Sequence, residues 1–233
     1  MRKLAFLALT AALVVPAALV FTAPESAALT SLDRLKAGNV TFAAHPDAAL
    51  PITAERRTEL AKGQTPFASV LSCADSRVPP EVIFHTGLGD LFVVRAAGQV
   101  TDKSVLASLE YAAEHLHSPL IVVMGHESCG AVKAAAETPA TTSLGVNLDY
   151  LLKAIRPSVA ATASEPEATR LRAAILKNVE ETLNDVVEGS PILKKMLDEG
   201  EIGAVGAYYE LGSGRVHFSE PVVNKPGKTG HVK

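Results

Sequence analysis

Two cysteines and one histidine follow apolar segments that have the composition of buried strands. Cys73 ends the run that starts at Phe67, and His126 and Cys129 directly follow the run 120–125. In open α/β sheets, ligand sites form beyond the carboxyl ends of the strands, so these side chains lie where a site is expected. Two thiolates and one imidazole are common zinc donors, and three protein ligands leave a fourth position open for catalysis. The pattern therefore indicates a catalytic zinc site.

The spacing alone leaves other interpretations open. The pattern His-x-x-Cys is short, and Cys73 and Cys129 could instead form a disulfide in an exported protein or remain inert buried thiols. Asp75 and Arg77 favour the metal site over these alternatives. Two charged residues in the strand-end loop that carries Cys73 are more readily explained by a functional site than by chance. A solvated salt bridge between them is the alternative.

The first segment, residues 1–28, has the layout of a secretory signal peptide. Arg2 and Lys3 form a basic start, residues 4–20 are apolar and uncharged, and small residues lead to Ala28. An uncleaved membrane anchor is the alternative, since this apolar run is at the lower length limit of a spanning helix. In both cases we expect an exported protein, periplasmic or secreted, with no membrane contact unless the segment stays uncleaved.

Length and composition favour one folded domain for the remaining chain, although the length would also allow two small ones. The 233 residues are 48% hydrophobic and 20% charged, which excludes general disorder. Because 22 basic residues face 25 acidic ones, no basic excess supports binding to nucleic acid. We therefore expect a single catalytic domain over residues 29–219, followed by a polar, flexible C-terminal tail over residues 220–233.

The hydrophobic pattern predicts an α/β fold, with a central, mostly parallel β-sheet flanked by helices. Strands are expected at 67–73, 91–95, 120–125 and 202–211, with a closing hairpin strand at 215–218. Helices are expected at 29–39, 53–61, 104–117, 131–136, 148–155, 169–187 and 191–197. Gly38 and Asn39 are interpreted as the stop of the first helix, and Pro157 as a helix break.

Three motifs carry a resemblance to a known family. They are Cys73-Ala-Asp-Ser-Arg-Val-Pro-Pro-Glu81, Gly89-Asp-Leu-Phe-Val-Val-Arg95 and Gly125-His-x-x-Cys-Gly130. Together they resemble the β-class carbonic anhydrases, and the similarity extends from Leu32 to Tyr208. The resemblance implies the fold of that family, with an N-terminal helical arm that embraces a second subunit in a homodimer or a higher even oligomer.

The resemblance also implies a mechanism. Cys73, His126 and Cys129 would bind one Zn2+ per chain, and zinc-bound hydroxide would hydrate CO2 reversibly to bicarbonate and a proton. Asp75 would accept a hydrogen bond from the zinc-bound water while Arg77 holds it, and would become the fourth zinc ligand if that pair opened. Since two thiolates donate more charge than histidines would, a working range at alkaline pH is expected unless the surroundings compensate.

Several points stay open at this stage. The same site could hydrolyse a CO2 analogue such as carbonyl sulfide or carbon disulfide, and the non-catalytic domain with a Cys73–Cys129 disulfide remains the alternative from another class.

Some relatives use a tryptophan in a second, noncatalytic bicarbonate site. This chain has no Trp, so we expect that site to be absent and the Asp75–Arg77 pair to be closed. His85 could relay protons, although a position on the surface or the pocket wall is favoured. Arg95 is expected to form a structural ion pair.

Overall fold

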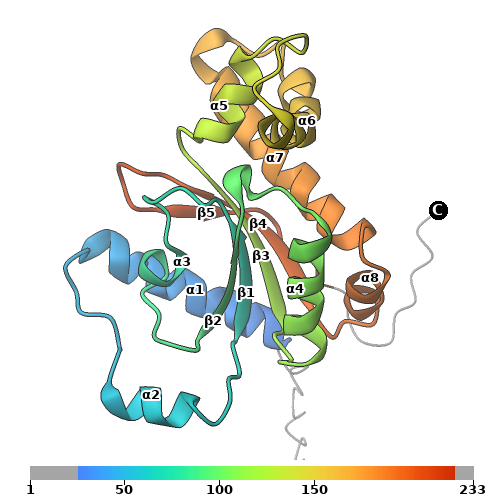
Figure 1. Cartoon of the computed structure of the whole chain (residues 1–233). Helices are drawn as coiled ribbons and strands as arrows, with labels where there is room; N and C mark the ends of the chain where they lie inside the picture. The colour runs from blue at the N-terminus through green and yellow to red at the C-terminus, as the bar shows by residue number, and fades with distance from the viewer. Residues whose placement is uncertain (1–25, 224–233) are drawn as a thin grey trace, which may run out of the picture.

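The computed structural model describes residues 26–223, which form a sheet with the strand order β2-β1-β3-β4-β5 (Figure 1). The strands are β1 (Ala68–Ser72), β2 (Leu91–Arg95), β3 (Leu120–His126), β4 (Gly203–Tyr209) and β5 (Val216–Phe218). The first four run parallel, and β5 pairs antiparallel with β4. Every residue of β1, β3 and β4 is buried, as expected for strands covered on both faces. The predicted mostly parallel sheet is confirmed.

The strand order places a switch point between β1 and β3. From β1 the chain moves to the edge strand β2, and after α4 (Lys103–Glu114) it enters β3 on the opposite side of β1. The connections that leave β1 and β3 therefore diverge. A crevice beyond the carboxyl ends of two such strands is the usual ligand site of an open parallel sheet.

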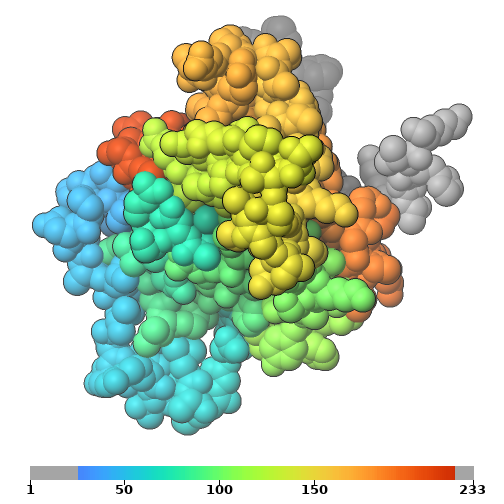
Figure 2. Space-filling model, turned by 45° about the horizontal axis from the view of Figure 1, so that its top comes forward, coloured from blue at the N-terminus to red at the C-terminus, as the bar shows by residue number. Residues whose placement is uncertain are grey.

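Helices cover both faces of this sheet. Alternate strand residues contact α1 (Ala27–Ala44) on one face, and α4, α7 (Glu167–Glu188) and α8 (Pro191–Asp198) on the other. The helices α5 (Gly130–Glu137) and α6 (Val146–Ala161) lie beyond the carboxyl ends of the strands, and Figure 2 brings this end forward. The short α3 (Pro80–Ile83) contacts α1, whereas α2 (Ala54–Leu60) has no buried residue and projects from the body (Figure 1).

The predicted stop at Gly38 and Asn39 is wrong, because α1 continues to Ala44. A Cβ at Gly38 would overlap the carbonyl group of Phe84, so this glycine permits close contact between two segments. The Asn39 side chain is buried and donates to the carbonyl oxygens of Ile83 and Gly214, at 3.2 and 2.8 Å. Gly38 and Asn39 therefore make tertiary contacts, and they resemble a helix stop only in sequence.

The predicted break at Pro157 is also wrong, because this proline lies inside α6. Proline in a helix interior costs about 3 kcal/mol, since it removes one hydrogen bond and clashes with the preceding turn. The nearby residues Ile155 and Ser158 are at most 1% exposed, and α6 packs against both α5 and α7. Tertiary packing therefore offsets the local penalty.

The described chain begins within the predicted signal segment and ends within the predicted tail. Helix α1 starts at Ala27 with Ser26 as its N-cap, and Val222 pairs antiparallel with Ala204. The remainder of the predicted signal peptide, residues 1–25, and of the predicted tail, residues 224–233, lies outside the described residues. Among residues 26–223, no helix combines the length and apolar character that membrane crossing requires.

Candidate metal centre

The three predicted donors converge beyond the carboxyl ends of β1 and β3. The Sγ atoms of Cys73 and Cys129 and a ring nitrogen of His126 all lie within 4.8 Å of one another. Cys73 follows the last residue of β1, His126 is the last residue of β3, and Cys129 precedes α5. All three residues are at most 4% exposed. The adjacent parallel pairing of β1 with β3 brings them together from positions more than fifty residues apart.

The His126 ring is oriented so that one nitrogen remains available. Its Nδ1 lies 2.9 Å from the carbonyl oxygen of Glu127, to which it donates a hydrogen bond. Nδ1 therefore carries the proton, and Nε2 has a free lone pair. This Nε2 is buried and has no hydrogen-bond partner in the described chain, which is costly for a polar atom. A metal ion bound between the two sulfurs would satisfy it.

A tight turn brings Cys129 to the same point as His126. Ser128 has a φ of 54°, a left-handed conformation that reverses the chain between the two donors. Cys129 is the N-cap of α5, so its sulfur lies at the positive end of that helix dipole. This position favours negative charge on the sulfur, as a thiolate ligand requires.

The two cysteines are free thiols, and their ionisation is linked. A hydrogen bond from the Cys129 thiol to the Cys73 sulfur lowers the pKa of Cys73 to about 4. The same contact raises the pKa of Cys129, because a second thiolate would face the first. A cation must therefore offset the charge before both sulfurs ionise. Two thiolates, one buried imidazole nitrogen and this need for positive charge fit zinc.

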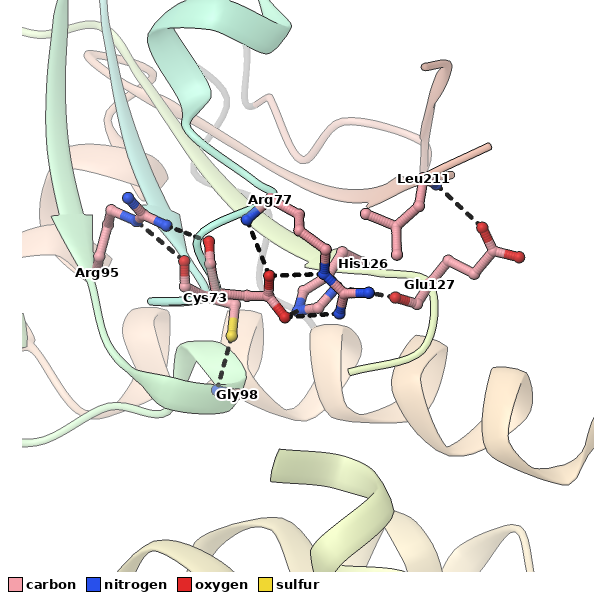
Figure 3. A network of polar contacts seen from close by, with 8 residues as sticks. Cys73, Arg77, Arg95, Gly98, His126, Glu127 and Leu211 are labelled. Atoms are coloured by element: carbon pink, nitrogen blue, oxygen red, sulfur yellow. Dashed lines mark hydrogen bonds and ion pairs between the residues drawn. The ribbon is translucent and has the colours of Figure 1, made fainter. Parts of the chain in front are cut away.

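Asp75 and Arg77 form a closed pair beside the donors. The Nε of Arg77 donates to Oδ1 of Asp75 at 2.9 Å, and its terminal nitrogen donates to Oδ2 at 2.7 Å (Figure 3). These charge-assisted hydrogen bonds hold the pKa of Asp75 far below its usual range. Oδ2 of Asp75 also lies 3.9 Å from Nε2 of His126. The structure thus has the expected closed pair, with the carboxylate at the edge of the donor cluster.

Arg95 does not form the structural ion pair expected from the sequence. Its guanidinium instead donates hydrogen bonds to the carbonyl oxygens of Cys73, at 3.0 Å, and Asp75, at 2.5 Å. No carboxylate within residues 26–223 lies at ion-pair distance from it. Figure 3 shows Arg95 on one side of Cys73 and the backbone amide of Gly98 below the sulfur, to which that amide donates at 3.3 Å. Arg95 therefore fixes the backbone of the loop that carries Cys73 and Asp75.

Sequence analysis missed the residues that support the donors from outside the motifs. Glu127 accepts a hydrogen bond from His126 through its carbonyl oxygen and another from the amide of Leu211 through its carboxylate (Figure 3). Asn178, on α7, donates to the carbonyl oxygen of Gly98 at 2.9 Å. A polar residue on a largely apolar helix face was the available signal for Asn178, whereas nothing in the sequence marks Glu127. His85 is half-buried after α3 and takes no part in the hydrogen bonds around the donors.

Comparisons with known proteins agree with this geometry. The family model described as carbonic anhydrase matches residues 68–216, which include all five predicted site residues. Carbonic anhydrase 2 of Mycobacterium tuberculosis is 37% identical over 206 residues, which cover 86% of this chain and 97% of the relative. The carbonic anhydrase of Mycolicibacterium smegmatis is 39% identical over 201 residues, which cover 84% of this chain and 95% of the relative.

Solved structures of β-carbonic anhydrases share the fold. The Coccomyxa enzyme in complex with acetazolamide has a TM-score of 0.68 at 26% identity, and the match covers 84% of this chain and 86% of that one. One of two tetrameric enzymes from Sordaria macrospora has a TM-score of 0.65 at 26% identity, with 82% and 95% covered. Sequence, fold and donor geometry agree: this chain belongs to the β-class carbonic anhydrase family of enzymes.

Proposed function

We propose that this chain is a zinc enzyme that interconverts CO2 and bicarbonate. The observation that carries the proposal is the buried cluster of two sulfurs and the unpartnered Nε2 of His126, next to the ionised carboxylate of Asp75. When bound by Cys73, His126 and Cys129, zinc supplies the Lewis acid that makes water a nucleophile near neutral pH. The chain must then orient that water and hold the carboxylate in place.

Asp75 is suited to orient the attacking water. Its carboxylate is ionised at all physiological pH values, because Arg77 lowers its pKa, so it accepts a hydrogen bond and does not remove a proton permanently. Arg77 fixes both carboxylate oxygens and thus the direction of the free lone pairs. If this pair opened, Asp75 would be close enough to the donors to become the fourth zinc ligand and close the site, so Arg77 also serves as a latch.

Assembly and location are further parts of the proposal. We expect a homodimer or a higher even oligomer, which is supported by the tetrameric state named for the Sordaria macrospora enzymes. From the sequence we expected the arm over the helix 29–39 and the proline-bearing stretch 45–53. Since Leu32 and Leu35 of α1 are buried in the core of the same chain, we place the arm at that stretch and at α2, which has no buried residue. The basic and apolar residues at the start of the sequence support export to the periplasm or the medium.

The first experiment is stopped-flow CO2 hydration on the purified protein, with zinc and free thiols measured on the same sample. Activity with about one zinc per chain, the stoichiometry of a three-ligand site, would support the proposal. Bound zinc without hydration would contradict it and would lead to assays of carbonyl sulfide and carbon disulfide hydrolysis. Absence of both zinc and free thiols would mean that Cys73 and Cys129 are oxidised in that form, and it would also contradict the proposal.

A further inference from the structure

One peptide group connects the metal centre to a helix far away in the sequence. The amide of Gly98 donates to the Cys73 sulfur at 3.3 Å, and the carbonyl oxygen of Gly98 accepts from the Asn178 side chain at 2.9 Å. We propose that Asn178 is a positioning residue, which acts through Gly98 to hold a hydrogen-bond donor on the metal-binding sulfur of Cys73. This inference rests on the proposed zinc binding.

The backbone around Gly98 has a conformation that needs external support. Gly98 and Gln99 have φ values of 63° and 46°, so two consecutive residues are left-handed. This conformation is easy for glycine but costs a residue with a Cβ about 1 kcal/mol. A side chain at Gly98 would also meet Ile155 at 2.8 Å and Ala131 at 3.2 Å. The segment is therefore confined on one side by α5 and α6 and strained at Gln99, and Asn178 holds its carbonyl group.

The burial of Asn178 indicates that its hydrogen bond to Gly98 does more than fill space in the core. It is 2% exposed and lies on the buried face of α7, between apolar residues such as Ile175 and Val179. A buried amide costs stability unless it is paired, so an apolar residue would serve simple packing better. Gln99 is 1% exposed, and neither polar atom of its side chain has a partner in the described chain. The Gly98–Gln99 segment is thus shielded from water, and the donor for Gly98 comes from α7.

A hydrogen bond to a metal-binding thiolate changes the metal as well as the backbone. The N–H group withdraws charge from the sulfur, so the sulfur donates less charge to the metal. The backbone of Asp75, in the same loop as Cys73, also contributes to this sulfur. Gly98 instead comes from a separate segment, whose carbonyl group Asn178 holds. Hydrogen bonds to the sulfur would thus offset part of the negative charge that two thiolates donate to zinc, and the ion would keep more of its Lewis acidity.

The test compares Asn178→Leu, which removes the donor and keeps the branched shape of the side chain, with Thr182→Val as the matched control. Thr182 is 4% exposed and lies one turn further along the same face of α7. Zinc affinity is measured by competition with a chelator, and the sulfur-to-metal charge-transfer band is recorded after replacement of zinc by Co2+.

We expect Asn178→Leu to weaken zinc binding about 10-fold or more, within the range for supporting ligand contacts. The band should move to longer wavelength, because the sulfur becomes a stronger donor. Thr182→Val should change neither.

The outcomes separate this inference from the proposed function. If wild-type protein binds neither zinc nor Co2+, the proposed function fails. If wild-type protein binds both and the band of Asn178→Leu coincides with that of wild type, the positioning role is wrong. Equal changes in both variants would also overturn it, because they would reflect only the loss of a buried polar group. Should Asn178→Leu fail to fold, Asn178→Ala removes the same donor without adding bulk, and its band decides in the same way.

Discussion

Asp75 and Arg77 are two positions apart, and their short separation determines the direction of the carboxylate. The backbone amide of Arg77 donates to Oδ1 of Asp75 at 2.9 Å, and its guanidinium reaches both oxygens. The loop therefore forms a small ring in which the carboxylate has three donors. Arg77 is half-exposed while Asp75 is mostly buried, so the positive partner can move into solvent more easily than the carboxylate.

Arg77→Ala should retain zinc and lose most CO2 hydration. None of the three metal donors depends on the guanidinium, whereas the direction of Asp75 does, and misplacement of a positioning group costs about 100-fold in rate. Zinc content and stopped-flow rates of the same preparation are the measurement. Arg170→Ala is the control, because Arg170 is also exposed and donates to a backbone carbonyl, that of Glu165, outside the site. Full activity of Arg77→Ala would contradict the latch.

The pH dependence of stability should report the same pair. The pKa of Asp75 is lowered in the folded state, chiefly by the hydrogen bond from Arg77. A lowered carboxyl pKa stabilises the fold fully above the unfolded value, about 3.9, and this stabilisation is lost as pH falls through the folded pKa. Asp75→Asn should therefore be less stable than wild type at pH 7, and the difference should shrink below about pH 4. The free energy of unfolding of metal-free wild type and metal-free Asp75→Asn, measured with denaturant from below about pH 4 to pH 7, gives this difference. A difference independent of pH would show that the charge is not responsible.

At the scale of elements, the site depends on close contact between β3 and α7. A Cβ at Gly125, the residue before His126, would lie 2.6 Å from Val179 and 3.3 Å from Ile175. By contrast, a Cβ at Gly130, the residue after Cys129, would meet nothing within 4 Å. Both glycines flank a metal donor, but only Gly125 is required by packing.

Gly125→Ala should therefore destabilise the zinc-loaded protein by about 1–3 kcal/mol, the usual cost of overpacking a core. Gly130→Ala is the matched control and should be neutral or slightly stabilising, because alanine favours the helix. Thermal unfolding measures both. Addition of Val179→Ala to Gly125→Ala should recover part of the loss, since it removes the clashing methyl groups. Equal effects of the two glycine substitutions would contradict the packing argument.

The elements also show how far sequence patterns determine this structure. Buried parallel strands are short apolar runs, and the predicted strand 91–95 coincides with β2. Gly38 and Pro157 misled the helix predictions, because local preference was outweighed by contacts with residues distant in sequence. The convergence of Cys73, His126 and Cys129 could be predicted because their residue types limit the chemistry. Asn178 was visible only as a polar residue on a largely apolar helix face, and its contact with Gly98 could not be predicted, because that contact exists only where α7 meets Gly98.

At the scale of the whole molecule, the contacts of the first turn of α1 bear on the proposed export. The hydroxyl of Ser26 accepts a hydrogen bond from the amide of Leu29 at 3.3 Å and caps α1. Ala28 is 4% exposed and packs against β4, where a Cβ at Gly203 would lie 2.8 Å from its methyl group. Processing after Ala28, the boundary expected from sequence, would remove both contacts. If the chain is exported as proposed, we therefore expect the cut to lie upstream of Ser26 and to leave the first turn of α1 intact.

Two shortened chains test this boundary. A chain that starts at Ser26 should unfold at the same temperature as the full-length chain. A chain that starts at Leu29 should be less stable by about 0.5–2 kcal/mol, the usual cost of a lost N-cap. The deficit should be larger still because the contact of Ala28 with β4 is lost and the new ammonium group lies in the first turn of α1, where positive charge opposes the helix dipole. Intact mass of the exported protein identifies the natural N-terminus. A mature chain that begins at Leu29 with undiminished stability would mean that the first turn of α1 contributes nothing to the fold, and that processing is free to remove it.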